Sequence, residues 1–213
     1  DVPDPAAGPG QVVVGIRAVG VNPMETYIRS GSYHVKPDRP YTPGLESSGV
    51  IESVGEGVTS FKTGDRVYTS SSLSGTYAEK TLCAADSVYP LPDRVSFEQG
   101  AAVDVAYSTS YHALFQRTRV FPGETVFING ASGGVGIAAV QFARNAGMKV
   151  IGTGGTENGR ALVAEQGAHH VLDHTAPDYF ARFMELTGGR GADVIVEMLA
   201  NVNLAKDLTA VAR

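Results

Sequence analysis

The sequence predicts an α/β protein with two parts, a β-rich first half and a doubly wound parallel sheet in the second half. Three observations support this fold class. Short apolar runs separated by Gly and Pro fill the chain to about residue 92. From about residue 125, strand-like and helix-like segments alternate. A glycine-rich stretch, residues 129–138, lies between the first strand and the first helix of that alternating part.

The first half consists of valine-rich or alternating segments, which are typical of strands. Turn signals such as Asn22-Pro23 and Pro43-Gly44 separate them. The expected strands are residues 11–21, 49–58, 64–70 and 76–84. Many short strands with intervening turns indicate a small β-barrel or a β-sandwich.

The second half changes from strand periodicity alone to an alternation of strands and helices. The expected strands are residues 125–129, 148–154, 170–174 and 192–199, and the expected helices are residues 135–147, 157–168 and 177–188. Alternation of this kind builds a parallel sheet with helices on its faces.

Composition excludes several classes of protein. The 213 residues carry a net charge of −5, so a surface that binds polyanions is not expected. No stretch approaches the roughly 20 apolar residues that span a bilayer. The single cysteine, Cys83, permits neither an internal disulfide nor a thiolate zinc cluster, which suits a reducing compartment such as the cytosol. We expect Cys83 to be a buried structural thiol.

The glycine-rich stretch indicates a cradle for phosphates. Gly130, Gly133 and Gly136 are spaced at three-residue intervals, with Ser132 where the strict dinucleotide fingerprint has glycine. Such a turn lets the backbone approach a pyrophosphate, and the following helix directs its N–H groups and positive dipole end at the anion. The alternative is a purely structural tight turn.

The segment after the second strand favours NADPH over NADH. Enzymes that prefer the unphosphorylated ribose usually carry Asp or Glu at this point. Residues 153–156 read Thr-Gly-Gly-Thr, which leaves room for a 2′-phosphate that Arg160 could reach. Arg160 on a solvated helix face is the alternative, and Glu157 would oppose a 2′-phosphate if its side chain turned inward.

Four segments resemble the zeta-crystallin family of quinone oxidoreductases, in the medium-chain dehydrogenase/reductase superfamily. They are residues 20–33, 41–55, 129–144 and 197–208. The resemblance implies a GroES-like domain over residues 1–96 and a Rossmann domain over residues 97–213, with the active site in the cleft between them. It also implies that a strand before residue 1 and part of the nucleotide domain after residue 213 are missing.

Zinc-dependent members of the superfamily carry a Gly-His-Glu motif and a Cys ligand. The matching residues are Leu45, next to Glu46, and Asn22, and neither leucine nor asparagine can replace imidazole or thiolate on zinc. We therefore expect a protein without a metal, in which Glu46 has a structural role.

The resemblance also assigns individual site residues. Asn22 and Tyr27 are the candidate catalytic residues, with Tyr33 as a weaker candidate. The candidate cofactor contacts are Tyr27, Ser132, Gly133, Gly134, Val135, Gly155, Arg160, His174 and Asn203. The alternatives left open are turn chemistry for Asn22, a core aromatic for Tyr27 and a solvated histidine for His174.

The resemblance implies NADPH-dependent reduction of quinones, a cytoplasmic location and a homo-oligomer, either a dimer or a tetramer. Two alternatives remain open. One is reduction of alkenals or enones with NADPH, and the other is a non-enzymatic role as a lens crystallin or a binder of AU-rich RNA.

Overall fold

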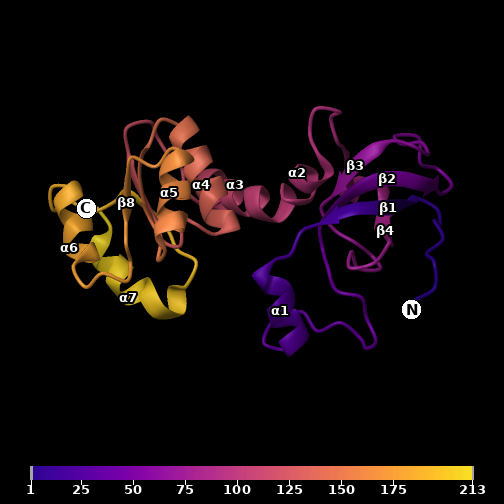
Figure 1. Cartoon of the computed structure of the whole chain (residues 1–213), viewed down its shortest axis with the longest axis horizontal. Coiled ribbons are helices and arrows are strands. Elements are labelled where there is room, and N and C mark those ends of the chain that lie inside the picture. Colours follow the sequence, from indigo (N-terminus) through magenta and orange to yellow (C-terminus); the bar gives the residue numbers. More distant parts are fainter. Residues whose placement is uncertain (1, 213) are drawn as a thin grey trace. The chain divides into compact units, whose positions relative to one another are not determined.

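The computed structural model describes residues 2–212, which form two compact units that divide between Val105 and Ala106. The elements of the first unit are β1 (Gln11–Val19), α1 (Pro23–Ser30), β2 (Ser47–Val54), β3 (Arg66–Thr69), β4 (Lys80–Ala84), a 3₁₀ turn (Ala85–Ser87), β5 (Val88–Pro90) and α2 (Phe97–Ala101). Figure 1 shows these elements from indigo to magenta.

The first unit is built on one five-stranded antiparallel sheet of order β4-β1-β2-β3-β5. This confirms the four expected strands, and β5 is an addition that the sequence pattern did not reveal. Alternate residues of the strands point into one core, which consists of Val12, Val14, Ile51, Val67, Cys83 and Val88. Cys83 is fully buried, as expected. The two packed sheets of a sandwich are not present among residues 2–212.

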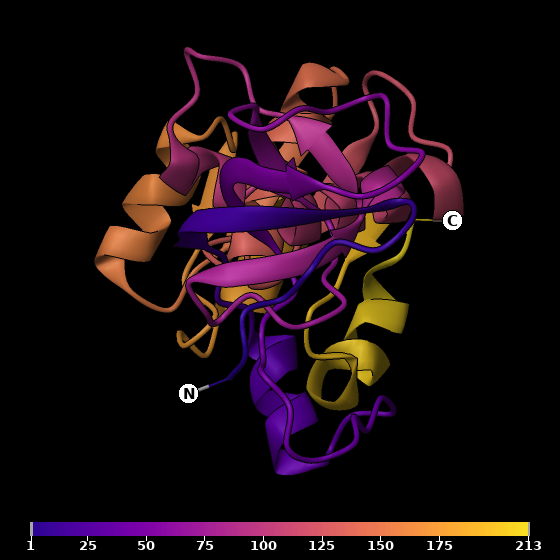
Figure 2. The same ribbon diagram turned by 90° about the vertical axis from the view of Figure 1, so that its right-hand side faces the viewer.

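Helix α1 lies in a segment that the sequence pattern had predicted only as a turn. Asn22 is the extended N-cap residue, Pro23 occupies the first helical turn, and Gly31 ends the helix in the left-handed conformation with φ 75°. Proline fits there because the first helical N–H groups have no intrahelical acceptor in any case. Figures 1 and 2 show α1 standing off the five-stranded sheet.

A run of helical turns links the sequence of the two units. It comprises a π-helical turn (Asp104–Ser108), α3 (Thr109–Tyr111) and a second π-helical turn (His112–Arg117). The sequence pattern did not predict this run. The buried Ser110 hydroxyl donates to the carbonyl of Val135 at 2.7 Å, and the Tyr107 hydroxyl donates to Gln141 at 2.7 Å. These bonds fasten α3 to the helix that follows the glycine turn.

The second unit contains the predicted alternation of strands and helices, followed by one further helix. Its elements are β6 (Thr125–Ile128), α4 (Gly134–Asn145), β7 (Lys149–Thr153), α5 (Glu157–Glu165), β8 (His170–Leu172), α6 (Tyr179–Leu186), β9 (Val194–Val196) and α7 (Ala200–Ala210). The parallel sheet has the order β8-β7-β6-β9. The chain thus runs outward from β6 to β8 and then returns to the other side of β6, which is the doubly wound topology.

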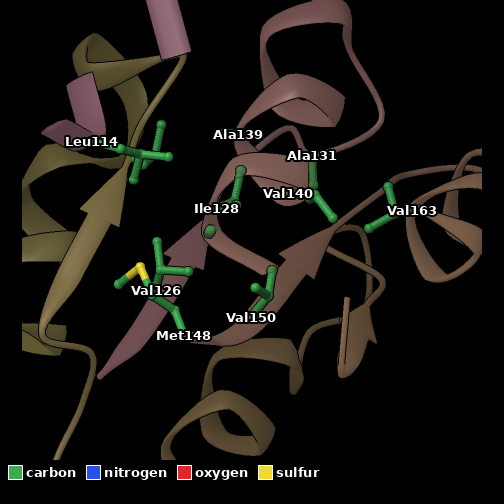
Figure 3. Packing of buried hydrophobic residues seen from close by; sticks show 11 residues of the cluster. Leu114, Val126, Ile128, Ala131, Ala139, Val140, Met148, Val150 and Val163 are labelled. Carbon is green, nitrogen blue, oxygen red and sulfur yellow. The ribbon is translucent and has the colours of Figure 1, made fainter. Parts of the chain in front are cut away.

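Alternation along β6 produces a core on each face of this sheet. Val126 and Ile128 pack with α4 and α5 in the cluster of Figure 3. Phe127 points to the other face, where its ring centroid lies 4.2 Å from that of Phe183 on α6. With both faces covered, the carboxyl ends of the strands are the open side of the unit, where ligands bind in folds of this type.

Candidate nucleotide-binding site and a polar cluster in the first unit

The glycine-rich turn follows β6 and is held against the end of β7. Gly130 has a left-handed φ of 68°. Its N–H donates to the Thr153 hydroxyl at 3.0 Å, and the Ala131 N–H donates to the Thr153 carbonyl at 2.9 Å. The Gly133 N–H closes the turn onto the Gly130 carbonyl at 3.1 Å. The turn is therefore ordered by the protein's own backbone.

The glycines of the turn differ in how much space an added side chain would have. A Cβ on Gly136 would lie 2.4 Å from the Gly130 carbonyl oxygen, so Gly136 lets α4 pack closely on the turn. A Cβ on Gly133 would meet only that same oxygen, at 3.5 Å, and one on Gly134 only Ala106, at 3.8 Å. Neither residue has a positive φ. The fold therefore gives no steric reason for glycine at positions 133 and 134.

The N-terminus of α4 lies where the turn opens. The first N–H groups of a helix have no intrahelical acceptor, and at α4 these belong to Gly134, Val135 and Gly136. The N-cap is Gly133, without a side chain, and the first turn carries no acidic residue. Exposed N–H groups at the positive end of a helix dipole are suited to binding phosphate.

The structure gathers several of the predicted cofactor residues around this turn. A Cβ on Gly155 would lie 2.9 Å from His174 Nε2, which shows that the ends of β7 and β8 are adjacent there. A Cβ on Gly159 would lie 3.1 Å from Ser132 Cβ, which shows that α5 approaches the glycine turn. His174 is exposed and Ser132 is half-buried. Ser132, Gly155 and His174 therefore border one open region at the carboxyl end of the sheet.

Arg160 is fixed by a partner that the sequence analysis missed. Its Nη1 donates to the Gly154 carbonyl at 3.2 Å and to Asp173 Oδ2 at 2.8 Å. Asp173 Oδ1 in turn accepts from the Thr175 N–H and hydroxyl, and these bonds are the main reason why its pKa is lowered. Among residues 2–212 no acceptor engages Arg160 Nε or Nη2, so the other edge of the guanidinium is available to a ligand.

Asn203 lies on α7 within a group that we name the carboxamide–carboxylate cluster: Asn129, Glu197, Asn203 and Asp207. Glu197 accepts from the side chains of Asn129 and Asn203, and Asn129 also donates to Asp207. Burial and the neighbouring Glu197 carboxylate raise the pKa of Asp207 to about 6. Of this cluster the sequence analysis identified only Asn203, because the other contacts join residues more than 60 positions apart.

The first unit holds its candidate residues in a second polar cluster. Asn22 Nδ2 donates to Glu46 Oε1 at 2.8 Å, and Glu46 Oε2 accepts from the Val105 N–H at 2.9 Å. Glu25 accepts from the N–H groups of Asn22 and Leu45, at 2.7 and 3.1 Å. Glu25 and Glu46 are both buried. They therefore bind and order the loop that carries Asn22 and Leu45.

Two further groups in this unit have raised pKa values. Burial, followed by a 2.5 Å hydrogen bond to Glu25, raises the pKa of the Tyr77 hydroxyl. Burial, followed by the Glu46 charge, raises the pKa of Asp104. Tyr77 is therefore a stable donor that helps to hold Glu25 in place.

The candidate aromatic residues lie on or just after α1. Tyr27 is 49% exposed on α1, and Tyr33 stacks obliquely on His34 with ring centroids 4.3 Å apart. The exposure of Tyr27 does not fit the alternative of a core aromatic. By contrast, the buried Cys83 thiol has a pKa raised to about 11 by desolvation, which makes it a poor nucleophile at neutral pH.

Among residues 2–212, no three His, Cys, Asp or Glu side chains gather in a way that could hold a metal ion. Within that same part of the chain, every helix is too short or too polar to cross a bilayer.

Comparisons with known proteins agree with this architecture. Residues 8–93 match the model of the alcohol dehydrogenase GroES-like domain, and residues 134–213 match that of the zinc-binding dehydrogenases. The human quinone oxidoreductase is 51% identical over 98% of this chain, and the pig protein of the same name is 53% identical over 98%. The chain spans 64% and 63% of the lengths of these two relatives.

A solved structure shares both the fold and part of the sequence. The Escherichia coli quinone oxidoreductase complexed with NADPH superimposes with a TM-score of 0.92 at 34% identity, covering 100% of this chain and 65% of that protein. The two domain models, the high identity to the relatives and this superposition agree. The chain therefore has the two-domain fold of the medium-chain dehydrogenase/reductase superfamily, and over nearly its whole length it is similar to quinone oxidoreductases.

Proposed function

We propose that the whole protein reduces quinones with NADPH and without a metal. The observation that carries this proposal is the open glycine turn at the N-terminus of α4, where Gly133 and Gly134 leave space that the fold itself does not need. The names of the relatives support the reaction, since two of them are quinone oxidoreductases with more than half of the aligned residues identical.

The residues present fit the cofactor. The pyrophosphate would bind to the backbone of Ser132, Gly133, Gly134 and Val135, with the adenosine half near Gly155, Arg160 and His174. Asn203 and Tyr27 would contact the nicotinamide half. When bound, NADPH supplies the hydride or the electron, and the protein supplies binding and orientation.

Arg160 supports the choice of NADPH over NADH. Its side chain is anchored at one edge by Asp173 and Gly154, so the free edge is pre-organised for an anion. Glu157, which would oppose a 2′-phosphate, is exposed in the first turn of α5.

Asn22 and Tyr27 are proposed to bind the carbonyl oxygen of the substrate. An amide N–H and a phenolic O–H are suitable donors to an oxygen that gains negative charge during reduction. Glu46, which occupies the Glu position of the zinc motif, orients Asn22 instead of supporting a metal. Leucine at position 45 cannot ligate zinc, which is why we propose a metal-free reaction.

Four further assignments belong to this proposal. The domains are residues 1–96 and 97–213, although the compact units of the structure divide between Val105 and Ala106. The protein is cytoplasmic and forms a dimer or a tetramer. RNA is not its main ligand, because a net charge of −5 gives little attraction for phosphates.

The test is turnover by the whole protein. We expect oxidation of NADPH with 1,2-naphthoquinone to be faster than oxidation with an alkenal at equal concentration, and to continue when a chelator is present. No turnover with any quinone would refute the proposed reaction, and loss of turnover with the chelator would refute the metal-free assignment.

A further inference from the structure

The carboxamide–carboxylate cluster lies at the topological switch point of the parallel sheet. Asn129 follows β6, Glu197 follows β9, and Asn203 and Asp207 come from α7. The chain leaves β6 toward β7 on one side, whereas β9 pairs with β6 on the other side. Doubly wound sheets bind their ligands in the crevice at this point.

The carboxamide–carboxylate cluster lies on the side of the sheet where the nicotinamide half of the cofactor is expected. Gly155, Arg160 and His174 lie at the ends of β7 and β8, where the adenosine half is proposed to bind. The glycine turn between β6 and α4 is proposed to hold the pyrophosphate. The nicotinamide half then extends toward β9, which is the side of the cluster.

Glu197 collects donors from three separate segments. Its Oε2 accepts from Asn129 Nδ2 at 2.6 Å. Its Oε1 accepts from the Leu199 N–H and from Asn203 Nδ2, the latter at 3.2 Å. One carboxylate thus joins the end of β6, the loop before α7 and the first turn of α7.

Asn129 links Glu197 to the buried Asp207. Its Nδ2 also donates to Asp207 Oδ1 at 3.1 Å, and both Asn129 and Asp207 are only 5% exposed. Asp207 Oδ2 is buried and receives no hydrogen bond from residues 2–212. This arrangement holds α7 and Glu197 together beneath the crevice.

Glu197 determines the orientation of the Asn203 carboxamide. A carboxylate oxygen accepts hydrogen bonds and does not donate them, so the amide NH₂ of Asn203 faces Glu197 and its Oδ1 faces away. Within residues 2–212 no group donates to Asn203 Oδ1, and the residue is partly exposed. The site therefore presents a hydrogen-bond acceptor of fixed orientation.

We infer that Glu197 is a positioning residue that holds the Asn203 carboxamide with its oxygen toward the crevice, where it accepts a hydrogen bond from the nicotinamide half of the cofactor. This inference rests on the proposed function. It assigns to Glu197 a role that depends on both carboxylate oxygens accepting hydrogen bonds. Glutamine cannot reproduce this role, because its NH₂ would face either the donor of Asn129 or the donors of Leu199 and Asn203.

The experiment compares two ligands and three variants in the whole protein. The ligands are NADPH and adenosine 2′,5′-bisphosphate, which has the adenosine half and lacks the nicotinamide half. The variants are Glu197→Gln, Asn203→Ala and the double variant, and Glu165→Gln on the exposed face of α5 is the matched control. Calorimetric titration gives the Kd of each ligand.

We expect Glu197→Gln and Asn203→Ala each to raise the Kd of NADPH about tenfold, which corresponds to the loss of one hydrogen bond. The double variant should bind NADPH no more weakly than either single variant, because the two substitutions remove the same contact. The Kd of the bisphosphate should stay within twofold of the wild-type value in every variant, and Glu165→Gln should resemble the wild type for both ligands.

Four results would overturn the inference. One is a wild-type Kd for NADPH in Asn203→Ala, which does not depend on how Glu197→Gln folds. Another is an equal rise in the Kd of NADPH and of the bisphosphate in Glu197→Gln, which would indicate that Glu197 has a general structural role. If the Kd of NADPH in the double variant rises by the product of the two single-variant factors, Glu197 does not act through Asn203. If the wild-type protein binds neither ligand, the proposed function fails and the inference fails with it.

Discussion

Gly133 and Gly136 are three residues apart in one turn, yet they are glycine for different reasons. Gly136 is required by the fold, because a methyl group would overlap the Gly130 carbonyl. Gly133 has an ordinary φ of −80° and open space around its Cα. Substitutions at these two positions therefore separate the stability of the turn from its capacity to bind a ligand.

Gly133→Val should abolish NADPH binding by the whole protein and leave its melting temperature nearly unchanged. The valine side chain fits the free protein but occupies the space through which the pyrophosphate reaches the N–H groups of α4. Fluorescence titration with NADPH and thermal melting measure the two effects. Gly136→Val is the contrasting variant and should unfold the unit or lower its melting temperature markedly. Wild-type affinity in Gly133→Val would refute the phosphate cradle.

Arg160→Ala should raise the Kd of NADPH about tenfold and leave the Kd of NADH nearly unchanged, because only NADPH carries the 2′-phosphate. The size corresponds to one charge-assisted hydrogen bond in a partly exposed site. Titrations with the two cofactors measure the ratio, and Arg182→Ala on the exposed side of α6 is the control for loss of a positive charge. Equal weakening of both cofactors would show that Arg160 does not recognise the 2′-phosphate.

The sequence predicted those site features that depend on local order along the chain. The glycine turn was predictable because strand, turn and helix are contiguous. Asp173 and the cluster around Glu197 were not, because their contacts join residues that are brought together only by the sheet. Asn129 and Asp207 are 78 positions apart, and no local pattern in the sequence pairs the two segments that contain them.

At the scale of elements, α7 is anchored by a buried carboxyl group next to a second carboxylate. The groups that face Asp207 are Glu197, which raises its pKa, and Asn129 and Lys206, which lower it. The folded pKa of about 6 lies above the ordinary value of 3.8. The unfolded chain therefore releases this proton at a lower pH than the folded protein, and the stability that the proton contributes is lost as the pH rises through 6.

Asp207→Asn should remove this part of the pH dependence. Asparagine keeps the size of the side chain and can donate to Glu197, but it does not titrate. Between pH 5 and pH 7.5 the free energy of unfolding of the wild type should fall relative to that of the variant, by on the order of 1 kcal/mol. Urea denaturation at the two pH values measures the difference. If wild type and variant differ in free energy of unfolding by the same amount at pH 5 and at pH 7.5, the pKa of Asp207 is not raised.

Helix α1 shows why element prediction failed where it did. Asn22-Pro23 and the nearby glycines are turn signals in a sequence, but the same residues serve as N-cap, first-turn proline and C-terminal glycine of a two-turn helix. The helix is too short for its apolar periodicity to be evident, and a buried Glu25 anchors it. By contrast, the longer helices α4, α5 and α6 were predicted because their apolar faces repeat.

At the scale of the whole molecule, the division of the chain into a β-rich part and an α/β part was predicted from a change in sequence periodicity, whereas the GroES-like character of the first part was implied by the family resemblance. The order β8-β7-β6-β9 corresponds to the 3-2-1-4 part of the strand order of a doubly wound dinucleotide-binding sheet. The zinc-binding dehydrogenase model matches the second part, yet Leu45 and Asn22 offer no imidazole or thiolate in the first. The chain thus combines the architecture of this superfamily with two residues that cannot serve as the imidazole and thiolate ligands of its zinc-dependent members.

We propose that this protein binds NADPH in preference to NADH. The most direct test is a fluorescence titration of the whole protein with NADPH and with NADH under identical salt and pH. We expect NADPH to bind at least tenfold more tightly, because Arg160 offers a free guanidinium edge to the 2′-phosphate and residues 153–156 carry no carboxylate that would repel it. Equal affinity for the two cofactors, or tighter binding of NADH, would contradict it.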